Sequence, residues 1–250
     1  MFTQKEHQVI GKGGKIANAG YDTTFFCRGE QLKVLQTNGL TVKSINGDFK
    51  INKINATDKF ENLEGADLIL VCVKAWQVKE IAIGLKSIIH NNTVVLPLQN
   101  GILAAEELSA EINPNHILGG LCKIISKIES PGVINHSGIE PLIVIGEFKN
   151  ITSERIIVVN ETLNNSGINS RIADDIIAEI WKKFMAICVS GLLAITRSTY
   201  GVVRELKETR NVMETLITEI YTVSQKAGIR LIPDIVEKTI AFIDTYPFDS

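Results

Sequence analysis

The chain has 250 residues, of which 45% are hydrophobic, so it is long enough to bury one large core or two modest ones. Its 26 basic and 28 acidic residues leave a formal charge of −2, which gives no electrostatic reason to expect nucleic acid or an anionic membrane as a partner. Residues 1–8 are polar and no apolar run has the length of a signal peptide or a membrane span, which predicts a cytoplasmic protein.

The segment that should open a nucleotide-binding domain is incomplete. Such a domain needs a strand followed by Gly-x-Gly-x-x-Gly at the start of a helix, because the glycines let backbone amides reach the pyrophosphate. Gly11 and Gly13 match the first two glycines and are candidate cofactor-binding residues, but the third position is Ile16. Only residues 8–10 precede them as a first strand, which is too short for the centre of a sheet. The helix that follows is expected to end at Gly20.

From about residue 21 to residue 147, short β-branched runs alternate with segments of helical spacing, which is typical of a parallel α/β sheet. The runs are apolar throughout, so both faces of the sheet are expected to be covered. Crossover helices are predicted at 77–89 and 103–112. The predicted strands are 23–27, 68–73, 93–97, 117–125 and 142–145.

Cysteines in these strands favour a reducing setting. Cys27, Cys72 and Cys122 lie in apolar runs, Cys188 lies in a later helical segment, and none of the four forms a Cys-x-x-Cys pair. Buried free thiols account for this pattern better than disulfides or zinc, so no metal is expected.

After the turn signal at 130–132 and the stretch 146–170, the pattern becomes helical alone. A domain boundary is therefore placed near Ala173. The sequence predicts a Rossmann-type, NADP-binding domain over 1–172 and a smaller all-helical substrate domain over 173–250. Helices of the second domain are predicted at 174–198, 203–227 and 233–245.

Arg28 directly follows the second strand of the nucleotide-binding domain. An acidic residue at this position holds the ribose hydroxyls of NAD, whereas an arginine suits the 2′-phosphate of NADP. Arg28 therefore favours NADP as the cofactor. The alternative is an ordinary arginine in a solvated turn.

Five segments, in order along the chain, carry a specific pattern. They are residues 20–32, 38–40, 71–77, 98–101 and 131–136. In this order they resemble the ketopantoate reductase (2-dehydropantoate 2-reductase) family, and the similarity extends from about residue 13 to residue 250. The resemblance implies an NADPH-dependent oxidoreductase of pantothenate and coenzyme A biosynthesis that reduces 2-dehydropantoate, a 2-oxo acid, to pantoate.

The resemblance also assigns roles to Lys74 and Asn100, which fall at the carboxyl ends of strands, where open α/β sheets bind their ligands. Lys74 is expected to bind the nucleotide, and Asn100 to contact the nicotinamide side or the substrate. Taken singly, each has a plain alternative as a loop lysine or as a turn residue before Gly101. His136 is left without a role because nothing nearby pairs with it.

A lysine of the helical domain is the candidate catalytic group, because a lysine can protonate the alkoxide that forms when a 2-oxo acid is reduced. On a projection of residues 174–198, the apolar stripe is centred on Phe184 and Lys182 lies nearly opposite it. Lys183 lies on the flank of the stripe and could face a cleft between the domains.

By itself, Lys183 also fits a surface lysine paired with Glu179 one turn earlier. The resembling family has a Trp-x-Lys pattern at its catalytic lysine, and Trp181 precedes Lys183 at that spacing. This match makes Lys183 the predicted catalytic and substrate-binding residue.

The substrate side departs from the family pattern. Three asparagines expected after the lysine fall on Ile187, Gly191 and Gly201, which removes polar contacts worth about 1 kcal/mol each. A related 2-oxo acid therefore stays open as the substrate. The chain reaches only the first part of the family's last segment, at Ser250, and lacks its glutamate, so truncation at both ends is expected.

Two other interpretations stay open. One is a truncated, non-catalytic member of the family that cannot hold NADP. The other is a neighbouring dehydrogenase family with the same two-domain plan, such as a 3-hydroxyacid or opine dehydrogenase, against which the motifs at 74–77 and 181–183 count. The oligomeric state is open as well, with a homodimer as one option.

Overall fold

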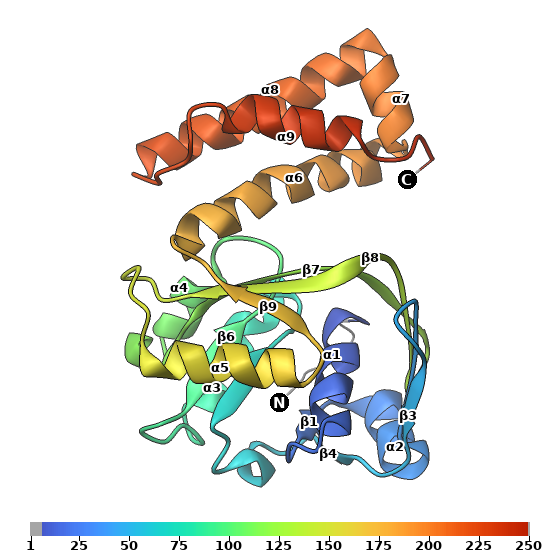
Figure 1. Ribbon diagram of the computed structural model, residues 1–250, viewed down its shortest axis with the longest axis vertical. Coiled ribbons are helices and arrows are strands. Elements are labelled where there is room, and N and C mark those ends of the chain that lie inside the picture. Colours follow the sequence, from blue (N-terminus) through green and yellow to red (C-terminus); the bar gives the residue numbers. More distant parts are fainter. Residues whose placement is uncertain (1–6, 250) are drawn as a thin grey trace. The chain divides into compact units, whose positions relative to one another are not determined.

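The computed structural model describes residues 7–249 and consists of an α/β unit followed by a helical unit, which confirms the predicted fold class (Figure 1). Contacts between residues divide the chain into a unit that ends at Ile176 and a unit that begins at Ile177. The first unit contains α1 (His7–Asn18), β1 (Thr24–Phe26), α2 (Gly29–Asn38), β2 (Leu40–Ser44), β3 (Phe49–Ile51), β4 (Asn55–Thr57), β5 (Leu68–Val71), α3 (Val78–Leu85), β6 (Val94–Pro97), α4 (Ala104–Ser109), β7 (Gly119–Ser130), β8 (Val133–Gly146), α5 (Glu154–Asn165) and β9 (Asn169–Ile172).

The strands whose carboxyl ends are expected to bind ligands are paired in parallel. β1 pairs with β4, and β5 pairs with β6, in both cases in parallel. A parallel bridge between Val95 and Ile117 continues the second pair toward β7. The parallel arrangement predicted from the apolar runs is therefore present at β1, β5 and β6, with ends that differ by one or two residues.

Residues 8–10, the only segment that could have supplied a strand before the glycines, belong to helix α1. The end of this helix is as expected: it finishes at Asn18, and Gly20 follows with a φ of +93°. A positive φ of this kind is adopted readily only by glycine, so Gly20 turns the chain from α1 toward β1.

The strands predicted at 117–125 and 142–145 were expected in a parallel sheet, but they belong to a long antiparallel hairpin that extends beyond both ranges. β7 and β8 pair along most of their length around a turn at residues 131 and 132. β8 also pairs in parallel with β2 and with β9, so a mixed sheet forms.

Helix α5 and strand β9 begin in the stretch 146–170, in which no element was predicted from the sequence, although the buried residues Ile156, Val159 and Leu163 have helical spacing. Ser153 caps the start of α5, where its Oγ accepts a hydrogen bond from the Ile156 amide at 3.4 Å.

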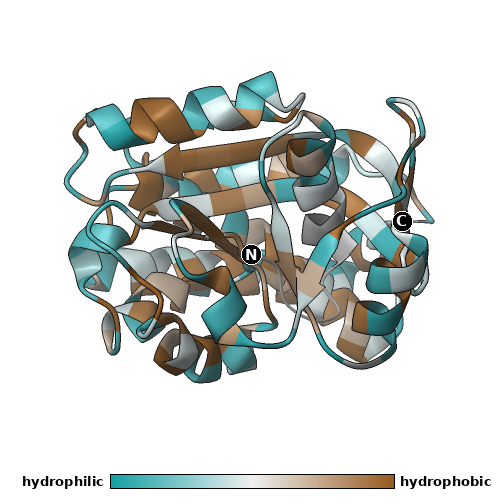
Figure 2. Cartoon of the chain, turned by 90° about the horizontal axis from the view of Figure 1, so that it is seen from below, coloured by the Kyte–Doolittle hydropathy of each residue, from teal (hydrophilic) through white to brown (hydrophobic). Residues whose placement is uncertain are grey.

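Two apolar clusters cover the two faces of the parallel strands, as their continuous apolar character predicts. Alternation along β1 sends Phe25 into one cluster and Phe26 into the other, and Leu70 and Ile69 divide in the same way on β5. Figure 2 shows the strands of this unit mostly in brown, as expected for hydrophobic strands covered by helices.

The helical unit has its own core. It comprises α6 (Ile176–Thr196), α7 (Tyr200–Glu205), α8 (Lys207–Lys226) and α9 (Ile235–Asp244). Fully buried Met213 and Ile217 of α8 and Ile243 of α9 belong to this unit. Arg210 joins the two helices by donating from Nη1 and Nη2 to Asp244 at 2.6 and 3.0 Å. Within residues 7–249, no helix combines the length and apolar character needed to cross a membrane.

A buried ion pair fixes the start of α5 against the end of β8. Glu147 is 8% exposed, and its carboxylate accepts hydrogen bonds from Arg155 Nε at 2.7 Å, Arg155 Nη2 at 2.6 Å and Ser153 Oγ at 2.5 Å. Burial raises the pKa of Glu147, but the hydrogen bonds from Arg155 and Ser153 outweigh burial and hold that pKa below its usual value.

Replacement of Glu147 by glutamine is expected to lower the free energy of unfolding by about 2 kcal/mol at pH 7. A depressed pKa stabilises the fold above the unfolded value near about 4.3, and this stabilisation is lost as pH falls through the folded pKa. The deficit of the variant should therefore shrink below about pH 4. Urea unfolding at pH 7 and below about pH 4 measures this deficit, with Glu161→Gln on the exposed face of α5 as the control. An equal deficit at both pH values would contradict the assignment.

Candidate cofactor and substrate site

Lys74 and Asn100 lie at the same edge of the parallel sheet. Val71 of β5 and Pro97 of β6 are register partners, and Lys74 and Asn100 each follow their strand end by three residues. Lys74 begins the short 3₁₀ turn Ala75–Gln77, where its backbone amide donates to Gln77 Oε1 at 3.2 Å. Asn100 is exposed. The structure therefore brings together two predicted residues that are far apart in the sequence.

Gln99, which the sequence reasoning did not single out, is the most distinctive polar group at this edge. It is only 7% exposed, and neither its Nε2 nor its Oε1 has a hydrogen-bond partner within the described part of the chain. A buried amide without partners is costly, and such groups in native proteins often meet a ligand or water. The signal available in the sequence was its position directly before Asn100, in a motif already linked to ligand binding.

Arg28 lies at the same edge, at the end of β1 and the start of α2. Its side chain is 44% exposed, and Nη1 donates to Oε1 of Glu80 at 3.2 Å. Glu80 is in the first turn of α3, which directly follows the turn that Lys74 begins. The guanidinium carbon is also 5.7 Å from the centre of the Phe26 ring. These contacts hold a cation at the strand ends without burying it.

The neighbouring Cys27 thiol is not a nucleophile at this edge. Burial, with a smaller contribution from the negative charge of Asp58, raises the pKa of Cys27 to about 12. The thiol is therefore protonated at neutral pH and contributes packing alone. Cys72 and Cys122 are buried as well, as predicted, whereas Cys188 is half-buried.

The glycine-rich segment does not form the predicted loop. Gly11 and Gly13 lie inside α1, where backbone amides bond to carbonyls of the preceding turn, so they are not aimed at a pyrophosphate. Close packing gives another reason for small residues here. A Cβ on Gly14 would lie 2.7 Å from Leu40 Cδ2, which is closer than a Cβ can approach, whereas one on Gly11 would make an ordinary contact with Ile134 Cγ2 at 3.5 Å. The proposed roles of Gly11 and Gly13 in cofactor binding are therefore corrected.

Helix α6 has two apolar faces instead of the single stripe predicted. Its buried face carries Ala178, Trp181, Met185 and Val189, whereas Phe184, the expected centre, is only half-buried. The helical projection merged the two faces because apolar residues surround most of the helix.

Lys183 borders the second, half-buried face of α6. It lies about 160° around the helix from Met185 but only about 40° from Ile187. The side chain of Lys183 is half-buried. Its neighbour Lys182 lies about 60° from Met185, so it is not opposite the buried face as predicted. Lys182 Nζ donates to Glu179 Oε1 at 2.8 Å.

The positions expected to carry substrate-binding asparagines differ in the space they offer. Gly191 is exposed, and no atom lies within 4 Å of where its Cβ would be. Gly201 is buried, and its Cβ would lie 2.0 Å from Cδ2 of the Phe248 ring. A side chain could therefore be added at Gly191 but not at Gly201.

Gly201→Asn is expected to lower the free energy of unfolding by about 1–3 kcal/mol, because the Phe248 ring must move. Gly191→Asn, its matched control, should stay within about 0.5 kcal/mol of the unchanged chain, since asparagine favours a helix slightly more than glycine does. Chemical denaturation of both variants measures the difference. Equal stability of the two variants would show that Phe248 does not fill the space beside Gly201.

Ser250 lies outside the described residues.

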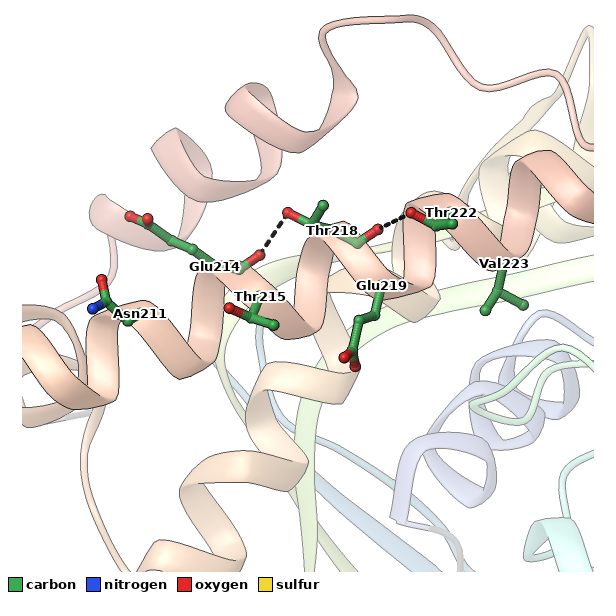
Figure 3. Close-up of a pocket in the computed structure, with 7 residues that line it drawn as sticks. All are labelled: Asn211, Glu214, Thr215, Thr218, Glu219, Thr222 and Val223. Atoms are coloured by element: carbon green, nitrogen blue, oxygen red, sulfur yellow. Dashed lines mark hydrogen bonds between the residues drawn. The ribbon is translucent and has the colours of Figure 1, made fainter.

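Two hollows of the described chain lie away from these residues. One, of about 740 Å³, lies along α8 and is bounded by seven side chains of that helix alone (Figure 3). The other, of about 1280 Å³, lies in the first unit at the amino ends of β1 and β5. Neither is lined by Arg28, Lys74, Asn100 or Lys183.

Comparison with known protein families identifies both units. Residues 11–150 match the family described as ketopantoate reductase PanE/ApbA, and residues 175–249 match the C-terminal region of the same family. A curated relative, the 2-dehydropantoate 2-reductase of a Nostoc strain, is 31% identical over 247 residues, which cover 93% of this chain and 76% of that protein.

Solved structures agree on the fold. The crystal structure of 2-dehydropantoate 2-reductase from Porphyromonas gingivalis superposes with a TM-score of 0.89 at 24% identity, over 98% of this chain and 87% of that one. A ternary structure of D-mandelate dehydrogenase with NADH and anilino(oxo)acetate gives a TM-score of 0.84 at 18% identity, over 99% and 81% of the two chains. At such identities the likeness concerns the fold alone.

Proposed function

The chain belongs to the ketopantoate reductase PanE/ApbA family of oxidoreductases, and on this premise we propose that it reduces a 2-oxo acid to a 2-hydroxy acid with NADPH. The first candidate substrate is 2-dehydropantoate, which is named in the relatives. A role in pantothenate and coenzyme A biosynthesis, in the cytoplasm, follows from that substrate.

One observation carries the choice of cofactor. The guanidinium of Arg28 stands at the carboxyl end of β1, where the adenosine ribose of a dinucleotide binds, and its partner there is the exposed Glu80. A guanidinium presents several donors to a phosphate, which favours NADPH over NADH. The NADH in the D-mandelate dehydrogenase structures belongs to those proteins, so the preference of this chain requires measurement.

The remaining residues of the strand ends suit the other half of the cofactor. Lys74 would supply positive charge toward the phosphates, and the unpartnered amide of Gln99, with Asn100, would bind the nicotinamide amide or the substrate. Gly11 and Gly13 take no part in this proposal, because they lie within α1.

In the proposed reaction Lys183 acts as the general acid. When bound, NADPH supplies the hydride that reduces the carbonyl carbon of the 2-oxo acid. As the carbonyl oxygen gains negative charge, the ammonium of Lys183 donates a proton to it, which yields the 2-hydroxy acid. A cation near the substrate also suits its carboxylate.

A non-catalytic role is favoured by a separate observation. The pyrophosphate-binding loop of a dinucleotide site is replaced by helix in the described residues. Fluorescence titration with NADPH decides between the two roles: dissociation in the micromolar range supports the reductase, and no saturable binding would leave only a binding or degenerate fold.

The substrate is tested by the loss of NADPH absorbance with a panel of 2-oxo acids. We expect turnover of 2-dehydropantoate; turnover of 2-oxoisovalerate or phenylglyoxylate alone would indicate a paralogue with another substrate. The altered positions Ile187, Gly191 and Gly201 make this panel necessary, since the family's asparagines are absent there.

A further inference from the structure

One face of helix α6 carries three kinds of side chain in succession. Ser190 lies seven residues after Lys183, which is about 20° short of two full helical turns, so the two residues share a face. Ile187 lies between them, about 40° around the helix from Lys183. All three are half-buried. Along the helix this face therefore presents a cation, an apolar surface and a hydroxyl group.

The hydroxyl group of Ser190 belongs to a pair. Its Oγ lies 2.8 Å from the hydroxyl oxygen of Tyr200, the first residue of α7, and either oxygen can be the donor. Tyr200 is only 9% exposed, and its ring packs edge-to-face against that of Tyr246, with ring centres 4.6 Å apart. Aromatic packing thus holds the Tyr200 hydroxyl against α6.

This hydroxyl pair has one donor more than it uses. Each hydroxyl has a single hydrogen, and the bond between Ser190 and Tyr200 takes one of the two. The second hydrogen has no acceptor among the hydrogen bonds of residues 7–249. Because an unpaired donor at a largely buried tyrosine is costly, an acceptor from outside the chain is favoured here.

Space for a ligand lies beside the pair. Apart from its chain neighbours and the backbone of its own helix, nothing in the described part of the chain comes within 4 Å of a Cβ placed on Gly191. Gly191 and Ile187 stand where the family pattern has asparagines, so an apolar side chain and open space replace two amides. The hydroxyls of Ser190 and Tyr200 adjoin these altered positions.

We propose that the hydroxyl pair of Ser190 and Tyr200 is a substrate subsite, which binds the hydroxyl group of a 4-hydroxy-2-oxo acid while Lys183 holds its 2-oxo end. The inference rests on the proposed function. It selects 2-dehydropantoate among 2-oxo acids, because the branched apolar carbon of this compound lies between its oxo and hydroxyl groups, as Ile187 lies between Lys183 and Ser190.

The lengths agree with this arrangement. Seven residues of helix rise about 10 Å. A four-carbon chain of about 5–6 Å, with a hydrogen bond of about 2.8 Å at each end, covers a similar span. The flexible stem of the lysine adjusts the remaining difference.

Two substrates that differ by one oxygen atom test the subsite. They are 2-dehydropantoate and 3,3-dimethyl-2-oxobutanoate, which lacks only the hydroxyl group. The loss of NADPH absorbance with the full chain gives kcat/KM for each compound. We expect at least about a tenfold preference for 2-dehydropantoate, because a site that hydrogen-bonds a substrate hydroxyl discriminates against the analogue without it.

Removal of both hydroxyls in the double variant Ser190→Ala/Tyr200→Phe should lower this preference at least about fivefold, while kcat/KM for the analogue stays within about threefold. Each single variant should lose less, because the remaining hydroxyl can turn toward the substrate. Ser198→Ala and Tyr221→Phe remove hydroxyls elsewhere in the helical unit and should leave the preference unchanged.

The outcomes separate the subsite from the proposed function. An unchanged preference in the double variant overturns the subsite, and so does an equal loss of kcat/KM for both compounds, which would indicate a role in packing alone. If the unaltered chain reduces both compounds equally well, the subsite is overturned but the proposed function stands. If it reduces neither, the proposed function fails, and the subsite fails with it.

Discussion

Replacement of Lys183 by alanine is expected to lower kcat for 2-oxo acid reduction by about 10²- to 10⁴-fold, the range that a positioned general acid contributes. The affinity for NADPH should stay the same, because Lys183 is proposed to act on the substrate oxygen. Steady-state kinetics and an NADPH titration of the same variant separate the two quantities.

The neighbouring lysine provides the matched control for this result. Lys182 is one residue away and its Nζ is paired with Glu179, so Lys182→Ala should change kcat by no more than about threefold. If a primary amine added to Lys183→Ala restores part of the turnover, the lost group is the proton donor itself. Unchanged turnover in Lys183→Ala would remove Lys183 from the mechanism.

The pattern of apolar residues predicted the parallel strands because each short run needs both faces covered. All of Leu68 to Val71 and Val94 to Pro97 except the half-buried Leu68 are buried, and runs so short, bounded by turns and containing β-branched residues, favour strands over helices. Their carboxyl ends then placed Lys74 and Asn100 at one edge. Topology explains why the two residues lie at one edge, whereas their roles were assigned from the family resemblance.

Helix α1 could not be predicted in the same way. Three glycines and two β-branched residues within residues 9–14 give a weak local helix propensity, so a loop was the better expectation. The helix forms because it packs against β2, β7 and β8, where Gly14 approaches Leu40 closely and Ile16 is buried. Tertiary packing decides this segment, and packing is not visible in local sequence.

Gln99 and the two faces of α6 show a similar limit at the site. The sequence identified Asn100, but only the structure shows that the neighbouring amide is the buried one without partners. On α6, apolar residues nearly surround the helix, so periodicity could not tell the buried Met185 face from the half-buried Phe184 face. Both distinctions depend on neighbours that are distant in the sequence.

Replacement of Arg28 by alanine is expected to weaken NADPH binding by about 10- to 100-fold and to leave NADH binding within about twofold. A charge-assisted pair between a guanidinium and a phosphate is worth about 1.5–3 kcal/mol, and NADH lacks the phosphate. Parallel titrations with the two cofactors measure the ratio. Lys33→Ala, at an exposed position on α2, removes an equal charge nearby and should leave the ratio unchanged.

Glu80 allows the same hypothesis to be tested in the opposite direction. Its carboxylate accepts from Arg28 at 3.2 Å and so competes with an incoming 2′-phosphate for the guanidinium. Because an exposed ion pair is worth about 0.2–1 kcal/mol, Glu80→Gln should strengthen NADPH binding by no more than about fivefold and have no effect on NADH. Opposite shifts in the two variants would locate the 2′-phosphate at Arg28. If instead both variants bind NADPH as the unchanged chain does, the phosphate binds elsewhere and Arg28 is a turn residue.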